Sequence, residues 1–199
     1  PTNGTAALVD NTVAYVPAED FHGDDHFTYV ANDGTVDSAP ATIAITVTPV
    51  NDDPTGGALV ETTAEDTPIT FALVGDDVDG DALTYTISGG ADQSKFDLNS
   101  TTGVLTFKVA PDYEANESAA GNNAYVVEVN VSDGTLADTQ TITVTVTDVN
   151  EIPVITSVAT TSVSENQTYA IDVNATDADG DVLTYTISGG ADQSKFDLN

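Results

Sequence analysis

The chain has 199 residues, of which 33 are Asp or Glu and 3 are Lys or Arg, and its formal net charge is −30 at pH 7. This charge argues against nucleic acid and against an anionic membrane surface as partners, because both are bound through clustered cations. The absence of Cys excludes disulfides, zinc–thiolate sites and Cys nucleophiles. Hydrophobic residues still make up 40% of the chain, so we expect a folded protein whose excess carboxylates bind cations.

Short runs of alternating apolar and polar residues recur along the chain. In chain order they are 27–30, 83–87, 104–107, 125–131 and 141–147. Period-two alternation predicts β-strands with one face toward a core. Turn-forming sequences such as 79–81 and 132–134 separate the runs, and no segment predicts a helix longer than one turn. The aromatic residues expected in the core are Tyr85, Phe96, Phe107 and Tyr185.

An internal repeat defines the organisation of the chain. Leu83–Asn99 is identical to Leu183–Asn199, and 43–51 corresponds more weakly to 142–150. A unit of about 100 residues with seven short strands is the usual size of a small β-sandwich. We therefore predict an all-β protein of tandem Greek-key β-sandwiches, end to end, with incomplete first and last units. The predicted units are 1–52 (C-terminal half), 53–150 (complete) and 151–199 (N-terminal half), as in a piece of a longer array.

The acidic residues gather at strand ends, where Asp-x-Asp-Gly-Asp occurs at 77–81 and 177–181. An EF-hand counted from Asp77 would need Gly at Ala82 and Glu at Ser88, and it would need helical flanks, so that motif fails. A calcium β-roll fails as well, because its glycine pattern must recur in tandem. The plainest alternative is that these Asp-Gly pairs are ordinary turn formers.

The complete unit carries five acidic motifs in a fixed order. They are Glu65, Asp77-x-Asp79, Asp112-Tyr113-Glu114, Asp133-Gly134 and Asp148-Val149-Asn150-Glu151-x-Pro153. This order closely resembles the cadherin repeat over 53–150, and over 151–199 for half a unit. The sequences Ile-Ser-Gly-Gly-Ala-Asp and Asp-Ala-Asp-Gly-Asp are similar to cadherin-like repeats of large secreted bacterial adhesins. The segment 1–52 is closer to a related bacterial Ig-like repeat.

The resemblance implies Ca²⁺ bound at two junctions between units. For the junction between the middle and last units, the implied ligands are Glu65, Asp112, Glu114, Asp148, Asn150, Glu151, Asp177 and Asp179. For the junction between the first and middle units, they are Asn51, Asp52, Asp77, Asp79 and Asp133. The first unit departs from the pattern, with Glu19-Asp20 in place of the Asp-x-Glu motif and Pro49 in place of Asp148.

The function implied is that of a Ca²⁺-rigidified extender or adhesion repeat of a large extracellular bacterial surface protein. Its partners would be neighbouring repeats of the same chain or other copies. One alternative is a self-assembling filament subunit whose half-domains complement each other head to tail. Another is a module that binds cell-surface or matrix polysaccharide or protein. We expect no enzyme, because the chain lacks a Gly-x-Ser-x-Gly elbow and the complete unit lacks His. We also expect no membrane-embedded segment, because no apolar run approaches about 18 residues.

Overall fold

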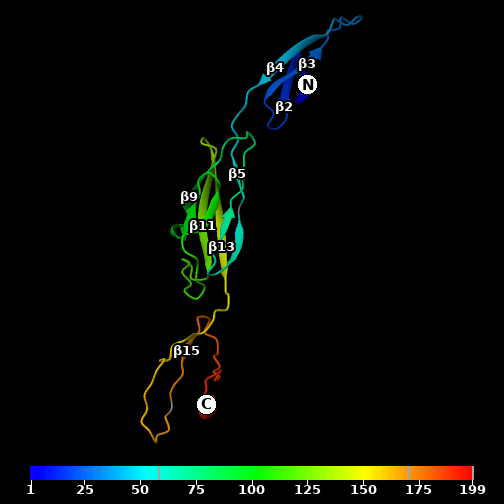
Figure 1. Cartoon of the computed structure of the whole chain (residues 1–199). Helices are drawn as coiled ribbons and strands as arrows, with labels where there is room; N and C mark the ends of the chain where they lie inside the picture. Colours follow the sequence, from blue (N-terminus) through cyan, green and yellow to red (C-terminus); the bar gives the residue numbers. More distant parts are fainter. Residues whose placement is uncertain (58, 170, 199) are drawn as a thin grey trace.

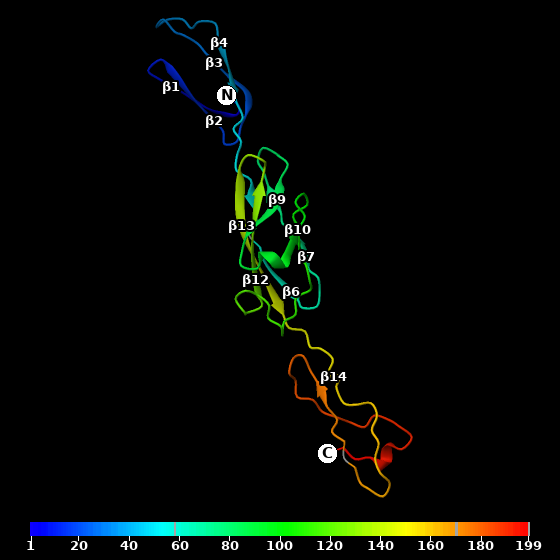
Figure 2. The ribbon, with the colours of Figure 1, turned by 90° about the vertical axis from the view of Figure 1, so that its left-hand side faces the viewer.

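The computed structural model describes residues 1–57, 59–169 and 171–198. Its strands form three groups that follow one another along an elongated molecule, with the N-terminus in the first group and the C-terminus in the last (Figures 1 and 2). The helical elements within the described ranges are two single 3₁₀ turns, η1 (Gln93–Lys95) and η2 (Gln193–Lys195). None of the described helices has the length and apolarity needed to cross a bilayer. The all-β expectation is confirmed.

The middle group is a two-sheet sandwich. One sheet has the order β6 (Val60–Ala64), β13 (Ala137–Thr147), β12 (Ala124–Ser132) and β9 (Thr84–Gly89). The other has the order β10 (Phe96–Leu98), β11 (Val104–Phe107) and β7 (Thr70–Ala72). β6 runs parallel to β13, and the remaining pairs in both sheets are antiparallel. The two sheets hold the seven strands predicted for a unit, and 53–150 also contains the two-residue strands β5 (Thr55–Gly56) and β8 (Gly75–Asp76).

The core of this sandwich lies between the facing sides of its two sheets. Along β13, every second residue from Ile142 to Val146 is at most 1% exposed, and β12 alternates in the same way. The ring of Phe107 lies 4.4 Å from that of Phe96 and packs edge-on against Tyr125 at 5.1 Å. Burying aromatic and branched side chains from both sheets stabilises the fold by about 25 cal/mol per Å² of apolar surface. The strand alternation read from the sequence is confirmed here.

The first group consists of two hairpins. β1 (Gly4–Val9) pairs with β2 (Thr12–Pro17), and β3 (Gly23–Tyr29) pairs with β4 (Ala41–Val47). The hairpins are joined by Asp25, which is 4% exposed and accepts hydrogen bonds from the N–H groups of Thr2 and Asn3 and from the Tyr15 hydroxyl. These bonds, led by that from Thr2, hold the pKa of Asp25 well below its usual value. A buried carboxylate thus orders this group, which has few buried apolar residues.

The last group differs from the sequence-based expectation. Its described strands are β14 (Val154–Ile155) and β15 (Ala175–Thr176), which pair with each other. Tyr185, which the sequence places in a core, is 40% exposed, whereas its counterpart Tyr85 is 7% exposed. Phe196 is 64% exposed, against 1% for Phe96. The expectation for Tyr185 is wrong, because the described residues of this group form no second sheet to cover its side chain, as β10, β11 and β7 cover the sheet that holds Tyr85.

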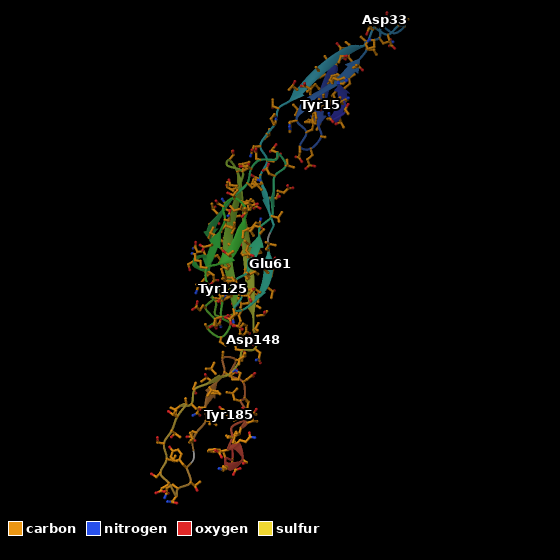
Figure 3. The ribbon with its side chains drawn as sticks, viewed as in Figure 1. Tyr15, Asp33, Glu61, Tyr125, Asp148 and Tyr185 are labelled. Carbon is orange, nitrogen blue, oxygen red and sulfur yellow. The ribbon has the colours of Figure 1, made fainter. Side chains whose placement is uncertain are left out.

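Two strand-free stretches, 48–54 and 148–153, connect the three groups. The predicted unit boundaries at 52/53 and 150/151 fall within them. We call the surroundings of 48–54 the first junction and those of 148–153 the second junction. The first junction also holds β5 (Thr55–Gly56), which pairs with β8 (Gly75–Asp76) directly before the 77–81 loop. Figure 3 shows Asp148 between the middle and last groups, with Tyr125 on one side and Tyr185 on the other.

Candidate metal centre

Glu65 is the organising residue on the middle-group side of the second junction. It follows β6 directly, and its side chain is 3% exposed. One carboxylate oxygen, Oε1, accepts the N–H of Val149 at 2.9 Å, and Oε2 accepts the N–H of Tyr113 at 2.7 Å. A carboxylate this buried requires such partners, since an unpaired buried charge is strongly unfavourable. Glu65 therefore fixes both the linker and the 112–114 loop.

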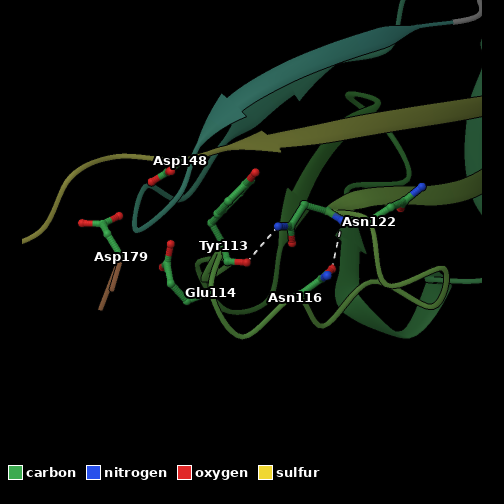
Figure 4. A pocket seen from close by; sticks show the side chains of 7 residues that line it. Tyr113, Glu114, Asn116, Asn122, Asp148 and Asp179 are labelled. Carbon is green, nitrogen blue, oxygen red and sulfur yellow. Dashed lines mark hydrogen bonds between the residues drawn. The ribbon is translucent and has the colours of Figure 1, made fainter. Parts of the chain in front are cut away.

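Acidic side chains from both sides of the second junction converge. Three groups each bring three carboxylates within 4.8 Å of one another: Glu65, Asp112 and Glu114; Glu114, Asp148 and Asp179; and Asp177, Asp179 and Asp181. The first two groups share Glu114, and the last two share Asp179. Figure 4 shows Asp148, Glu114 and Asp179 facing the same space. The carboxylates thus form a continuous series from the middle group, through the linker, to the last group.

The contribution from the last group comes from the 177–181 loop. Gly180 has a φ of 76°, a left-handed conformation that favours glycine, and its position lets the loop turn sharply. The N–H of Asp181 donates to Oδ1 of Asp177 at 3.3 Å. The linker is fastened to this loop, because the N–H of Glu151 donates to Oδ2 of Asp179 at 2.9 Å. The Asn150 side chain lies along the linker and donates to the carbonyl of Glu151 at 2.9 Å.

The carboxylates of the second junction are electrostatically uncompensated. Desolvation raises the pKa of Glu151 to about 7, and the charges of Asp179 and Glu65 add to the shift. Desolvation also raises the pKa of Asp148, followed by the close carboxylate of Asp179. The pKa of Glu114 rises through desolvation and the charge of Glu65. Like charges held this close favour the protonated form, or a bound cation.

The first junction repeats the same linker geometry. The N–H of Asp52 donates to Oδ2 of Asp79 at 2.8 Å, as Glu151 does to Asp179 in the second junction. Asp77 accepts the N–H groups of Asp79 and Asp81 through Oδ1, at 3.0 and 3.2 Å. Gly80 has a φ of 78°, close to that of Gly180. The two loops and their linkers are thus built alike.

Asp133 belongs to the first junction because its Oδ2 accepts the Asn51 side-chain amide at 2.6 Å. This bond is the main reason that the pKa of Asp133 lies below its usual value, and the N–H groups of Thr135 and Leu136 contribute as well. Within the described residues, the triplets of carboxylates closer than 4.8 Å lie at the second junction and not at the first. The first junction therefore has the same linker with a looser set of acids.

The donor set fits a hard divalent cation. Oδ2 of Asp77, at the first junction, and Oε2 of Glu151, at the second, are both buried atoms without a hydrogen-bond partner among the described residues. Each lies among further carboxylates. An orphaned buried carboxylate oxygen is costly unless a cation satisfies it. Ca²⁺ takes six to eight oxygen ligands in flexible geometry, and these sites offer oxygen alone, without Cys or His.

The structure brings six of the carboxylates predicted for the second junction into these clusters, and the linker residues Glu151 and Asn150 lie beside them. The five residues predicted for the first junction lie around its linker. Sequence reasoning missed Asp181, which joins a cluster with Asp177 and Asp179. The signal for it was present, since Asp181 ends the Asp-x-Asp-Gly-Asp motif. It also missed Asp66, whose charge contributes to the raised pKa of Glu151. That these residues bind metal stays a prediction.

A complete β-sandwich, joined through acidic junctions to a further β group on either side, places the chain in an Ig-like and cadherin-like class of protein. The model of the bacterial Ig domain family matches residues 1–46 and 51–147, and the chain belongs to this family. Among solved structures, it is similar to the protocadherin gammaB7 EC3-6 cis-dimer structure, with a TM-score of 0.54 and 19% identity over 88% of this chain and 48% of that chain. Extracellular cadherin domains 1-4 of protocadherin gamma B7 give a TM-score of 0.51 and 21% identity, covering 88% and 48%. These two likenesses concern the fold.

Three curated relatives show likeness in sequence. The chain is 27% identical to integrin beta-like protein A of Dictyostelium discoideum over 84% of this chain and 10% of that protein. It is 35% identical to protocadherin Fat 2 of Rattus norvegicus over 58% of this chain and 3% of that protein. It is also 35% identical to chitinase A of Pseudoalteromonas piscicida, covering 56% of this chain and 13% of that protein. The chain thus spans a small part of the length of each relative.

Proposed function

We propose that this chain is a calcium-stiffened spacer in an extracellular, adhesion-type protein of a bacterial surface. The observation that carries this proposal is the second junction, where Glu114 of the middle group and Asp179 of the last group lie in one carboxylate cluster with Asp148 of the linker. Such a cluster draws the two groups together only when a cation offsets the repulsion. Its role is mechanical and involves no catalysis.

The ions of the second junction would be held by seven carboxylates, those of Glu65, Asp112, Glu114, Asp148, Glu151, Asp177 and Asp179. Bound Ca²⁺ would supply positive charge shared by the two groups. The chain's own residues prepare this arrangement. Glu65 holds Val149 and Tyr113 in place, and Asp179 receives the linker N–H of Glu151, so the carboxylates are positioned before any ion binds. The surplus acid elsewhere keeps the surface charged and soluble.

The extracellular placement is supported by family membership and by the likeness to the extracellular cadherin domains of protocadherin gamma B7. The long, end-to-end arrangement of the three groups suits a spacer that holds a binding region away from a cell (Figure 1). The short linkers support it as well, because each spans only a few residues between neighbouring strands.

Small-angle scattering and thermal melting of the full chain test the proposal in EDTA, in Mg²⁺ and in Ca²⁺. Calcium should raise the melting temperature and give a longer, stiffer particle. A ligand at one hundred times its Kd stabilises the native state by about 2.7 kcal/mol. Mg²⁺ should have a smaller effect, because it demands tighter octahedral geometry. Equal melting curves and equal scattering in calcium and EDTA would contradict the proposal.

A second candidate function is association between copies of the chain. The specific observation is that Phe196 and Leu198 in the last group are 64% and 39% exposed, although Phe96 is fully buried in the complete sandwich. The sheet opposite Phe96 includes β13, and part of that strand has a relative in the first group, where 43–51 resembles 142–150. Sedimentation at increasing concentration tests this role, and a strictly monomeric chain would contradict it.

A further inference from the structure

The β3–β4 hairpin of the first group has the same strand register as the β12–β13 hairpin of the middle sandwich. In β3–β4, Phe27 lies opposite Ile43, and in β12–β13, Val127 lies opposite Ile142. The sequence match over 43–51 equates Ile43 with Ile142, so Phe27 is the counterpart of Val127. The first group therefore contains a counterpart of the two central strands of the larger sheet in the middle sandwich.

The two hairpins differ in what pairs with their outer edge. β12 also pairs with β9, where Val129 lies opposite Ile87. Within the described residues, β3 pairs with β4 alone. Tyr29, the counterpart of Val129, is 51% exposed, whereas Val129 is completely buried. The edge of β3 thus presents N–H and C=O groups that a further strand can use.

The chain carries a second copy of the sequence that occupies this place on β12. Residues 184–189 have the same sequence as β9, but they form no strand in the described structure. Their apolar side chains Tyr185 and Ile187 are 40% and 41% exposed. A β9 sequence without a neighbouring strand therefore lies in the last group, and a β12-like strand without its β9 lies in the first group.

Gly190 keeps the backbone that the close approach of such a strand requires. A Cβ at its counterpart Gly90 would lie 2.5 Å from the Cα of Val127 and 2.6 Å from the carbonyl oxygen of Val126, so glycine alone fits against β12. Gly190 has a φ of 114°, against 97° for Gly90, but no described atom lies within 4 Å of the same position. The space that β12 fills in the middle group is open here.

The first and last groups lie at opposite ends of the molecule, with the complete sandwich between them (Figures 1 and 2). The β3 edge and residues 184–189 of one chain are therefore too far apart to meet. The partner that fits both is a second copy of this chain.

We propose that residues 184–189 of one copy add as a strand to the free edge of β3 in a second copy, in the register that β9 adopts on β12. Tyr29 then lies opposite Ile187, and Val30 lies opposite Thr186. This inference rests on the second candidate function, association between copies, and names the two surfaces that carry it. The contact joins unlike ends of two copies, so repeated addition gives a linear assembly.

Two opposing effects set the strength of this contact. Strand addition completes main-chain hydrogen bonds and buries the apolar side chains of Tyr29 and Ile187. Against it acts the net charge of −30 on each copy. At 0.15 M salt, repulsion between exposed charges is screened beyond about 8 Å. Association should therefore strengthen as the salt concentration rises, and 0.15 M salt is the condition for the test.

The register is tested by cross-linking two full-length variants, Val30→Cys and Thr186→Cys, after mixing and mild oxidation. The chain has no other Cys, so each disulfide joins two copies. Their counterparts, Asn130 and Thr86, alternate with buried residues and lie on the outer face of their sheet, so these substitutions spare the apolar face. Thr184→Cys mixed with Val30→Cys is the control. A shift of two residues moves the partner about 7 Å along the strand, beyond the reach of a disulfide.

We expect a mixed disulfide dimer from the 30 and 186 pair, identified by mass spectrometry, and at least about tenfold less from the 30 and 184 pair. In sedimentation, Tyr29→Ser and Ile187→Ser should each weaken association about tenfold or more. Val182→Ser, on a residue that is 95% exposed just before the segment, should match the unmodified chain.

The outcomes separate this inference from the function on which it rests. A chain that associates equally well with Tyr29→Ser or Ile187→Ser, and gives no 30–186 cross-link, would overturn the inference and leave association by another surface. Equal cross-linking of the 184 and 186 variants would overturn the proposed register. A strictly monomeric chain at every concentration and salt would overturn both the inference and the second candidate function, and calcium binding at the second junction would be unaffected.

Discussion

The main-chain N–H of Glu151 donates to Oδ2 of Asp179 at 2.9 Å and so fastens the linker to the loop of the following group. The same contact occurs one unit earlier, where the N–H of Asp52 donates to Asp79 at 2.8 Å. Both acceptors precede a glycine in the left-handed conformation, Gly180 and Gly80. Both junctions therefore have the same arrangement, in which a main-chain N–H orients a carboxylate that could also bind a cation.

We expect Glu114 to contribute charge to the second junction and little to the stability of the sandwich. Glu114→Gln should lower calcium affinity there by about tenfold, because the residue belongs to two of the carboxylate clusters. In EDTA its melting temperature should stay the same or rise, since a repulsive charge next to Glu65 is removed. Calorimetric titration and melting measure the two effects. Asp172→Asn, on an exposed residue, is the control, and an equal loss of affinity in it would mean that the acids act as diffuse charge.

Glu65 should behave differently from Glu114. Glu65→Ala leaves the N–H groups of Val149 and Tyr113 without their acceptor, so the middle sandwich should lose about 2–3 kcal/mol of unfolding free energy even in EDTA. Urea denaturation of the full chain in EDTA checks this value. If Glu65→Ala is destabilising only when calcium is present, then its hydrogen bonds do not carry the structural role assigned to them.

The raised pKa of Glu151, about 7, predicts a pH dependence. A carboxyl whose pKa is higher in the folded state favours folding while protonated, so this contribution is lost as the pH rises from about 4.5 through 7. In EDTA the second junction should therefore be more ordered at pH 5 than at pH 8. Calcium binds the ionised form, so its affinity should rise over the same range, and binding should release protons.

Titration calorimetry at pH 6.5 in two buffers with different ionisation enthalpies measures the released protons. Asp133 and Asp138 have pKa values below the usual range, so they stay ionised throughout this window and do not contribute. Glu151→Gln should remove part of the proton release. A calcium affinity that is the same at pH 5.5 and pH 8 would show that the junction carboxylates are already ionised without the ion.

The two identical segments provide an internal comparison of stability. Trypsin meets the same local sequence at Lys95 and Lys195, but Phe96 is 1% exposed and Phe196 is 64% exposed. Cleavage after Lys195 should be at least about tenfold faster, because cleavage after Lys95 requires local opening of the sandwich. Mass spectrometry over a time course gives both rates, and in concentrated urea they should become equal. Equal rates under native conditions would mean that the last segment is as protected as its counterpart.

The sequence by itself determined the local backbone geometry. The two identical segments show this, because they keep the same backbone angles in different surroundings. Asp92 has φ −108° and ψ 16°, and Asp192 has φ −110° and ψ 17°, each before a 3₁₀ turn of the same three residues. The turn depends on contacts within a few residues, so it forms wherever that sequence occurs. The Asp-x-Asp-Gly-Asp loops follow the same rule, and the resemblance to the cadherin repeat is what pointed to their first two Asp residues as ligands.

Tertiary structure decided which segments became strands and which acidic side chains came close to one another. Thr84–Gly89 forms β9 because β12 pairs with it, whereas the same sequence at 184–189 has no described strand. A strand completes its hydrogen bonds only with a neighbour, which local sequence does not supply. For the same reason, the contacts of Glu114 with Asp148 and with Asp179 depended on how the groups are joined. Those contacts bring together like charges from residues that are far apart in the sequence, and no local sequence pattern predicts such contacts.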